Sequence, residues 1–194
     1  MLMTSGAAYG TTIVYNVSVT TGFPAALGSI EFQYNPGPVV PVLASTVTIS
    51  AFTPLTGVGV APSISGGVSG SLNTTLTINN STPFNDYFNT YTLPTTVTFT
   101  VTFSGPGVDT PGGNSGSTFA FFLYQDPAGM IPAGTSNVDG ILFRMDLSTV
   151  GAVSVTNFAS SPTSVTFQTA PEPATIALFP AALGALALMR RRRA

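Results

Sequence analysis

Strict alternation of threonine with apolar side chains is the feature that most restricts the fold of this chain. Between residues 96 and 103 every even-numbered position is Thr, while the odd-numbered positions hold Val97, Phe99, Val101 and Phe103. Successive side chains of a β-strand point to opposite faces, so this spacing places the apolar groups on one face and the hydroxyls on the other. The segment is therefore predicted to be a strand with one buried and one solvated face.

Similar alternation recurs along most of the chain. It defines about nine candidate strands, at residues 15–20, 30–34, 47–51, 72–78, 97–103, 119–123, 141–146, 153–155 and 165–167. The segments between them are rich in Gly, Pro and Asn, the residues typical of turns, above all at 35–38, 57–70 and 104–117. One polar and one apolar face per strand indicates antiparallel pairing. We therefore expect an all-β fold, an antiparallel β-sandwich, for which a jelly-roll winding is one of the arrangements left open.

One short segment has a helical spacing instead. Phe84, Tyr87, Phe88 and Tyr91 stand at positions i, i+3, i+4 and i+7, which predicts one or two helical turns that cap the sheets. The threonines and the proline that surround this segment favour helix poorly.

The composition supports a folded body with few charges. Only 6% of residues are charged, against about 25% in ordinary domains, yet 44% are hydrophobic and 14 are Phe. Disordered chains are poor in such residues, so hydroxyls and amides are expected to keep a globular body in solution. The basic residues are Arg144 and Arg190 to Arg193, which leaves one basic residue against seven acidic ones in residues 1–189. Such a body cannot neutralise a phosphate backbone, and nucleic-acid binding is not expected.

The residue types needed for most catalytic schemes are missing. There is no His, Cys or Lys, which removes the common general bases, thiol nucleophiles, Schiff-base lysines and the preferred zinc ligands. No cofactor, no metal and no catalytic residue is predicted, and the chain is expected not to be an enzyme. The acidic residues of the body occur in no recognisable catalytic frame, namely Glu31, Asp86, Asp109, Asp126, Asp139 and Asp146.

Two weaker kinds of binding site remain open. Asp126, Asn137 and Asp139 occupy one loop region, and Asp109 with Asn114 another; calcium takes such oxygen ligands, but local hydrogen bonds within turns are the favoured interpretation. Tyrosines could stack on sugar rings, although core packing is favoured for these residues, namely Tyr87, Tyr91 and Tyr124. Glycosylation patterns begin at Asn16, Asn73, Asn79 and Asn80, as expected by chance in such a composition.

The end of the chain has a different organisation. Pro171-Glu172-Pro173 is followed by an apolar segment, residues 174–189, and then by Arg190, Arg191, Arg192 and Arg193. A helix over the apolar segment would span about 24 Å, which is short against a hydrocarbon core of about 30 Å. The arginine cluster is expected to stay on the cytoplasmic side of a membrane, which would place the body outside. A buried helix packed on the sandwich is the less favoured alternative.

This arrangement resembles the PEP-CTERM sorting signal of Gram-negative envelope proteins. The resemblance implies recognition by an exosortase, a membrane enzyme thought to cleave near Pro-Glu-Pro. On this basis Pro171, Glu172 and Pro173 are the sorting motif, residues 174–189 a temporary membrane anchor, and Arg190 to Arg193 a cytoplasmic charge lock. The body is also similar to an uncharacterised domain found ahead of that signal, over residues 15–20, 32–37, 66–70, 84–88 and 103–113. Proteins of this kind tend to occur in bacteria that make exopolysaccharide and biofilm.

The sequence thus divides into three parts. Residues 1–10 resemble the remnant of a signal peptide, with an ordinary N-terminal tail as the alternative. Residues 11–169 form the predicted sandwich, and residues 170–194 form the sorting and anchor segment. The expected function is that of a non-enzymatic protein of the cell envelope or extracellular matrix, held in the inner membrane as a precursor and then found in the outer envelope or outside the cell. The alternative is a secreted glycan-binding module, with extracellular polysaccharide as its partner.

Overall fold

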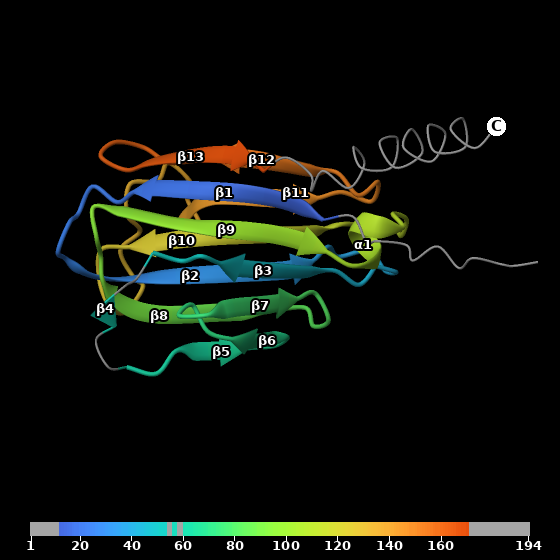
Figure 1. The fold of residues 1–194 in the computed structure, drawn as a ribbon, viewed down its shortest axis with the longest axis horizontal. Helices are drawn as coiled ribbons and strands as arrows, with labels where there is room; N and C mark the ends of the chain where they lie inside the picture. The colour runs from blue at the N-terminus through green and yellow to red at the C-terminus, as the bar shows by residue number, and fades with distance from the viewer. Residues whose placement is uncertain (1–11, 54–55, 58–59, 171–194) are drawn as a thin grey trace, which may run out of the picture.

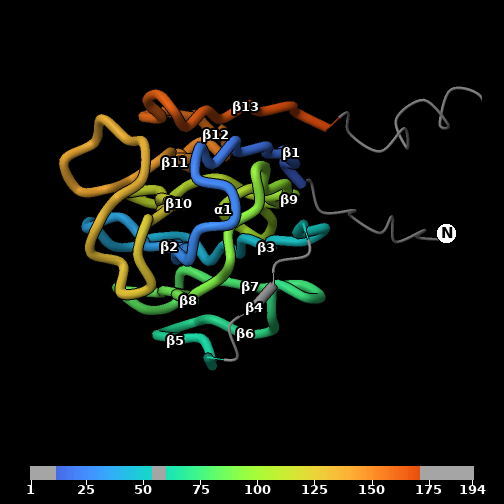
Figure 2. The backbone as a smooth tube through the Cα atoms, turned by 90° about the vertical axis from the view of Figure 1, so that its left-hand side faces the viewer, coloured from blue at the N-terminus to red at the C-terminus, as the bar shows by residue number. Residues whose placement is uncertain are grey.

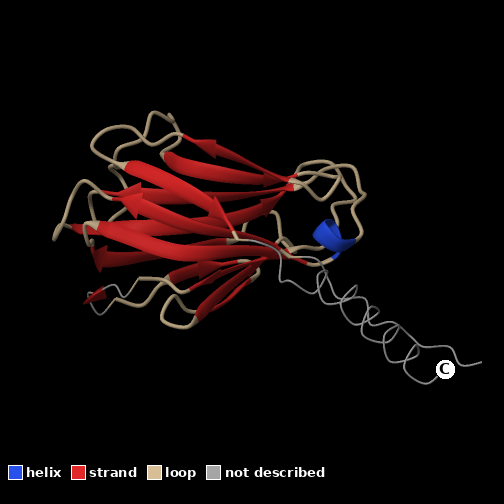
Figure 3. Ribbon diagram, turned by 45° about the horizontal axis from the view of Figure 1, so that its top comes forward, coloured by secondary structure: helices blue, strands red, loops and turns tan. Residues whose placement is uncertain are grey.

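The computed structural model describes residues 12–53, 56–57 and 60–170, which form an antiparallel β-sandwich (Figure 1). The predicted all-β fold class is confirmed. Figure 3 shows two layers of strands joined by loops at both ends, with one short helix, α1 (Pro106–Asp109). Among the described residues no helix is long and apolar enough to cross a membrane.

The two layers are called sheet A and sheet B. Sheet A contains, in spatial order, β13 (Ser164–Thr169), β1 (Ile13–Thr20), β9 (Thr96–Ser104), β3 (Thr46–Ser50), β7 (Thr75–Asn79) and β6 (Val68–Gly70). Sheet B contains β12 (Val153–Asn157), β11 (Ile141–Leu147), β10 (Ser117–Tyr124), β2 (Leu27–Pro36) and β8 (Asp86–Thr92). The short strands β4 (Thr56–Gly57) and β5 (Ser63–Ser65) both pair with β8. Each predicted strand is present, and β4, β5, β6 and β8 are additional.

The chain repeatedly changes sheets. The connections from β1 to β2, β2 to β3, β7 to β8, β8 to β9 and β9 to β10 all cross from one layer to the other. Hydrogen-bonded neighbours are therefore distant in sequence, and β1 lies between β9 and β13. This winding resembles that of a jelly roll.

The prediction of helical turns at residues 84–91 is wrong. Residues from Asp86 onward form β8, which pairs with β2 from Leu27 to Gln33. The period of two explains the burial better than the period of 3.6, because Tyr87, Asn89 and Tyr91 all face inward. Pairing with a ten-residue neighbour overrides a four-residue helical spacing in a segment with weak helix propensity.

Phenylalanines from both sheets meet in the core. The Phe32 side chain of β2 is completely buried. Its ring centroid lies 5.4 Å from that of Phe99 in sheet A, at an edge-to-face angle of 90°, and 5.0 Å from that of Phe121 in sheet B. Phe143 continues the cluster at 5.4 Å from Phe121. These rings occupy the inward-facing positions of their strands. The apolar residues of the alternating pattern in the sequence therefore form the core.

The two ends of the sandwich carry different loops. Both Ile13, at the start of β1, and Thr169, at the end of β13, lie at the end where α1 is found, as the register of β1 with β9 and β13 requires (Figure 1). The loop between β10 and β11 lies at the opposite end and forms the large bend of Figure 2. The predicted signal remnant at residues 1–10 and the sorting segment from Pro171 to Ala194 lie outside the described residues.

Truncation of Phe32 tests the inter-sheet cluster. Because Phe32→Ala empties a fully buried site between the sheets, we expect the free energy of unfolding to fall by about 3–5 kcal/mol. Chemical denaturation followed by far-UV circular dichroism measures it. The matched control is Phe84→Ala, at a half-exposed phenylalanine, with an expected change within about 0.5 kcal/mol. Equal losses in both variants would contradict the assignment of the core.

Candidate functional site

The outward face of sheet A is an uncharged array of hydroxyls and amides. We call it the hydroxyl face. It consists of Asn16, Ser18, Thr20, Thr46, Thr48, Ser50, Thr75, Thr77, Thr96, Thr98, Thr100, Thr102, Ser164, Thr166 and Gln168. The alternate residues of the same strands point into the core, which is why the polar ones gather on one side. Val14 is the apolar exception at an outward position.

The strand register arranges these side chains in rows. One row runs across five strands and consists of Gln168, Asn16, Thr100, Ser50 and Thr75. Within it the Thr100 hydroxyl donates to Asn16 Oδ1 at 2.9 Å. Neighbouring strands lie about 4.8 Å apart, so the face presents closely spaced donors and acceptors to solvent.

A shallow hollow of about 340 Å³ interrupts the hydroxyl face. The regular pairing of β3 with β9 ends at Ser50, and Ala51, with a φ of 49°, lines the hollow. The chain meets β9 again at Thr53, whose N–H donates to the Thr98 carbonyl oxygen at 2.8 Å. Polar side chains make up most of its lining, namely Asn16, Ser18, Thr98, Thr100, Thr166 and Gln168. The hollow has no charged lining residue, so it suits an uncharged polar ligand better than an ion.

The outward face of sheet B carries a second unusual group, which we call the carboxyl cluster. Tyr124 of β10 donates its hydroxyl hydrogen to Glu31 Oε2 at 2.7 Å. Gln33 Nε2 donates to the other oxygen of Glu31, and Asn35 Nδ2 donates to Gln33 Oε1 at 3.1 Å. Asp86 of β8 stands opposite Gln33. Its Oδ1 atom is buried and has no hydrogen-bond partner among the described residues.

Proximity and burial change the protonation of this cluster. Desolvation, followed by the charge and hydrogen bonding of Glu31, raises the pKa of Asp86 from 3.8 to about 8. Desolvation and Glu31 also raise the pKa of Tyr124. At neutral pH, Asp86 is therefore predominantly neutral beside Glu31. A neutral acid next to a second carboxyl group is the arrangement that acid–base catalysts use. The packing around Asp86 and Glu31 therefore decides whether they could act in this way.

Those surroundings are packed. Phe122 and Tyr124 of β10 are each only 7% exposed, and they form a small apolar cluster with Phe88. Gly129, in the loop between β10 and β11, has a φ of 71° and approaches the Phe88 ring so closely that a Cβ atom would lie 2.7 Å from it. The loop thus covers this aromatic patch, and the carboxyl cluster lies beside packed side chains.

Hydrogen bonds hold that loop in place. Ser29 donates its hydroxyl to the Asp126 carbonyl oxygen at 2.8 Å, and Thr90 donates to the Pro127 carbonyl oxygen at 3.1 Å. The Asp126 carboxylate accepts backbone N–H groups from within the loop, including that of Ile131 at 2.7 Å. The favoured interpretation of Asp126 as a local turn residue is confirmed.

The other residues considered for calcium are dispersed or locally bonded. Asn137 Oδ1 accepts the backbone N–H of Asp139 at 2.8 Å. Asn114 Nδ2 donates to the Val40 carbonyl oxygen at 2.6 Å, and Asp109 lies in α1. Among the described residues, no group of three or more acidic side chains could hold a metal ion.

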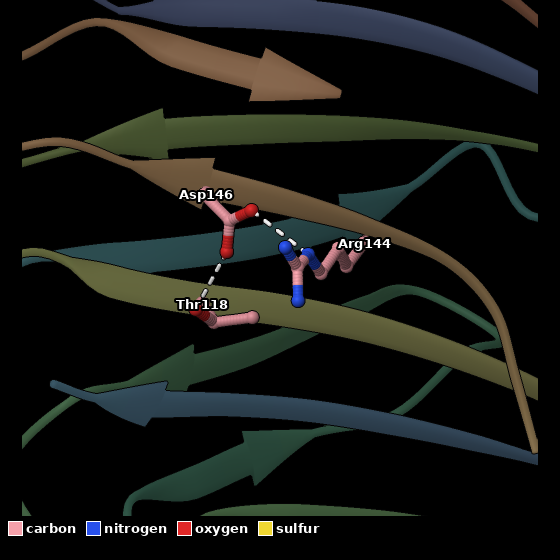
Figure 4. Close-up of polar contacts among 3 residues, drawn as sticks. All are labelled: Thr118, Arg144 and Asp146. Carbon is pink, nitrogen blue, oxygen red and sulfur yellow. Dashed lines mark hydrogen bonds and ion pairs between the residues drawn. The ribbon is translucent and has the colours of Figure 1, made fainter. Parts of the chain in front are cut away.

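The described residues contain one basic side chain, and it is paired. Figure 4 shows Arg144 and Asp146 on the same strand, with Arg144 Nε 3.0 Å from Asp146 Oδ2. Thr118, opposite Asp146 on β10, donates its hydroxyl to Asp146 Oδ1 at 2.7 Å. Both charged side chains are partly exposed, so this pair stabilises the fold only weakly.

Core packing is confirmed for two of the tyrosines considered for sugar stacking. Tyr87 and Tyr91 belong to the main core, and their hydroxyl oxygens lie 2.9 Å apart. Tyr124 belongs to the covered patch instead. None of the three can stack on a sugar from the surface of this fold.

One of the glycosylation patterns begins at a structural residue. Asn80 is 8% exposed. Its Oδ1 accepts the N–H of Ser45 at 2.9 Å, and its Nδ2 donates to the Leu43 carbonyl oxygen at 2.8 Å and to the Ser117 hydroxyl at 2.9 Å. This amide joins the β7–β8 connection to the β2–β3 connection and to the start of β10, whereas Asn16 and Asn73 are exposed.

The proximity of Glu31 and Asp86 was missed by sequence reasoning because 55 positions separate them, on two strands that the sequence does not show to be neighbours. The hydroxyl face left a clear signal, which is the threonine alternation itself. No family model, curated protein or solved structure matches this chain. The residues described above are therefore the basis for any function.

Replacement of Asp86 by Asn tests the carboxyl cluster. The folded state holds the Asp86 proton between about pH 4 and pH 8, while the unfolded chain releases it near pH 4. The folded protein thus binds more protons in this range, and the free energy of unfolding should fall as the pH rises from 4 to 8. One proton contributes at most about 1.4 kcal/mol per pH unit, and solvent screening of this partly exposed group reduces it.

Asp86→Asn keeps the neutral shape and should flatten this slope, making the variant more stable than the parent at pH 8. Melting temperatures measured at half-unit intervals between pH 4 and pH 8 check this. Asp139→Asn, at an exposed loop position, is the control and should follow the parent. Parallel curves for parent and Asp86→Asn would show that the Asp86 proton does not contribute to stability.

Proposed function

We propose that this chain is a non-enzymatic protein of the cell envelope or extracellular matrix, exported and processed through its C-terminal segment. In this proposal an exosortase-type enzyme recognises Pro171, Glu172 and Pro173. Residues 174–189 form the short hydrophobic helix that holds the precursor in the inner membrane, and Arg190 to Arg193 keep its end in the cytoplasm. The body then passes to the outer envelope or the medium.

The position of the last strand is the observation that best supports this proposal. β13 ends at Thr169, and the N–H of Ala170 donates to the Val14 carbonyl oxygen at 3.0 Å as the last bond of that ladder. Both sheets and the core are formed by residues that precede Pro171. Cleavage at or after the Pro-Glu-Pro motif would therefore leave every strand and every core side chain of residues 12–53, 56–57 and 60–170 in place.

The distribution of basic residues supports the same division between the body and the C-terminal segment. The described body contains Arg144 as its basic residue, and Arg144 is paired with Asp146, while the other four arginines all follow residue 189. A body with almost no positive charge has little to retain it on the cytoplasmic side of a membrane. The cluster at the chain end is the strongest such signal in the sequence.

Mass spectrometry of the mature protein from its native host tests the proposal. We expect a C-terminus upstream of Ala174, together with loss of the arginine cluster. Changing Pro171, Glu172 and Pro173 to Ala should keep the full-length chain in the membrane fraction, because the recognition element is removed. The control changes Thr169 to Ala, one residue before the segment, and should be processed normally. Intact C-termini on most wild-type molecules would contradict the proposal.

The hydroxyl face favours a second candidate function, the binding of an uncharged polysaccharide by the exported body. Its rows of hydroxyl and amide groups match the hydroxyl groups of a neutral sugar chain, and the hollow at Thr100 and Thr166 gives a place for one residue of that chain. The absence of charge on this face disfavours an acidic polymer, which would meet no cation there.

Affinity electrophoresis through gels that contain dextran tests this second function. Replacing Thr100 and Thr166 by Val removes two hydroxyls with little change of shape. If each hydroxyl forms one hydrogen bond worth about 1 kcal/mol, affinity should fall about fivefold per hydroxyl. Thr156→Val, on the outward face of sheet B, is the matched control. Retardation by alginate but not by dextran would contradict the choice of a neutral ligand.

A further inference from the structure

Two edge strands lie on the same side of the sandwich, and one of them is unusually open. β13 ends sheet A and β12 ends sheet B on this side, which is the upper side in Figure 1. β13 has six residues, Ser-Val-Thr-Phe-Gln-Thr, without charge or proline. Natural sheet edges are usually blunted by charges, by proline or by short length. On the opposite side the edge strands β4, β5 and β6 have only two or three residues.

The direction of the free hydrogen-bonding groups on β13 follows from its register. Ala170 donates to Val14, and bonded pairs alternate in an antiparallel ladder, so Gln168, Thr166 and Ser164 exchange hydrogen bonds with β1. The intervening residues, Val165, Phe167 and Thr169, point their N–H and C=O groups away from β1. Of these groups the Val165 carbonyl accepts Asn157 Nδ2 at 3.3 Å; the others have no partner among the described residues.

The side chains below this edge are apolar and incompletely covered. Phe167 of β13 and Val153 and Val155 of β12 pack on the core while remaining partly exposed. The Phe167 ring stands edge-to-face on Phe143, with centroids 5.0 Å apart. At the α1 end, Tyr15 reaches across the gap and donates its hydroxyl to the Val153 carbonyl oxygen at 3.4 Å. Over the remainder of the gap between the two edges, no strand of the described part of the chain closes it.

We propose that β13 is an assembly edge, on which a second copy of this chain adds its own β13 in antiparallel register. A two-fold axis at Phe167 would place Phe167 opposite Phe167 of the second copy, and Val165 opposite Thr169. The free N–H and C=O groups then pair with the same groups of the second copy, as an isologous interface requires. The uncharged edge introduces no repulsion between copies, and the second copy covers the partly exposed Phe167, Val153 and Val155.

This register makes a specific cross-linking prediction, which the lack of cysteine in the chain allows to be tested cleanly. Thr166 would face Gln168 of the second copy as a non-hydrogen-bonded pair, with Cβ atoms about 4.5–5.5 Å apart, whereas two Thr166 residues would be diagonal at about 7–8 Å. A disulfide needs Cβ atoms about 3.5–4.5 Å apart. We expect full-length Thr166→Cys mixed with full-length Gln168→Cys to form a disulfide-linked dimer when treated with diamide in detergent. Each variant alone should not.

Thr169→Pro is a variant that should abolish strand addition between copies without disturbing the fold of each copy. It removes an N–H that points away from β1, so the ladder with β1 is kept, and proline is tolerated at such edge positions. When it is added to both cysteine variants, the mixed disulfide should be lost while the melting temperature stays near that of the parent. Cross-linking through the hydrophobic C-terminal segment would not depend on this register, and equal yields from the mixture and from each variant alone would overturn the proposal.

Hydrogen exchange distinguishes the assembly of two copies from coverage of the β13 edge by another part of the same chain. In the assembled form the amides of Val165, Phe167 and Thr169 should exchange slowly, and dilution to the monomer should release them. Slow exchange of these amides in a chain that sediments as a monomer would show that residues 171–194 or another part of the same chain cover the edge. That result, or a folded protein without the mixed disulfide, would overturn the proposal. Neither result bears on processing at Pro171, which mass spectrometry measures separately.

Discussion

Contact between two sheets of inward-facing aromatic residues is the interaction on which the rest of this structure depends. Phe32 touches Phe99 across the gap and Phe121 within its own layer, so one ring connects strands that are distant in sequence. With 6% charged residues, the chain has few ion pairs to orient its strands. Burial of large apolar side chains is therefore the dominant force that brings the two layers together, at about 25 cal/mol for each Å² of apolar surface buried.

The same alternation determines the character of both outer surfaces. On sheet A the residues left outside are hydroxyls and amides in regular rows, with a hollow where β3 ends early. On sheet B the outside carries the carboxyl cluster and an aromatic patch, and a loop anchored by Asp126 covers that patch. Sheet A is thus the open face and sheet B the covered one, which is why the proposed ligand contact lies on sheet A.

The alternation allowed the fold class and most strands to be predicted, since a period of two survives in a single sequence. It could not show which strands are neighbours, because the chain crosses between sheets and places β1 beside β9 and β13. The paired acids Glu31 and Asp86 were hidden for this reason. The segment at 84–91 was assigned to helix because four aromatics happened to match a helical period; pairing with β2 decided the outcome. The buried amide of Asn80 had no signal beyond its position in a turn.

The assembly edge and the sorting segment meet at one place in the chain, and this has a consequence for their order of action. Thr169, the last residue of β13, precedes Pro171 by two positions. A precursor held in a membrane by residues 174–189 would have its β13 close to the bilayer and restricted in direction, so a second copy could approach only within the membrane plane. Release near Pro-Glu-Pro would remove that restriction. Processing and strand addition, if both proposals hold, are therefore coupled by geometry, with assembly favoured after release.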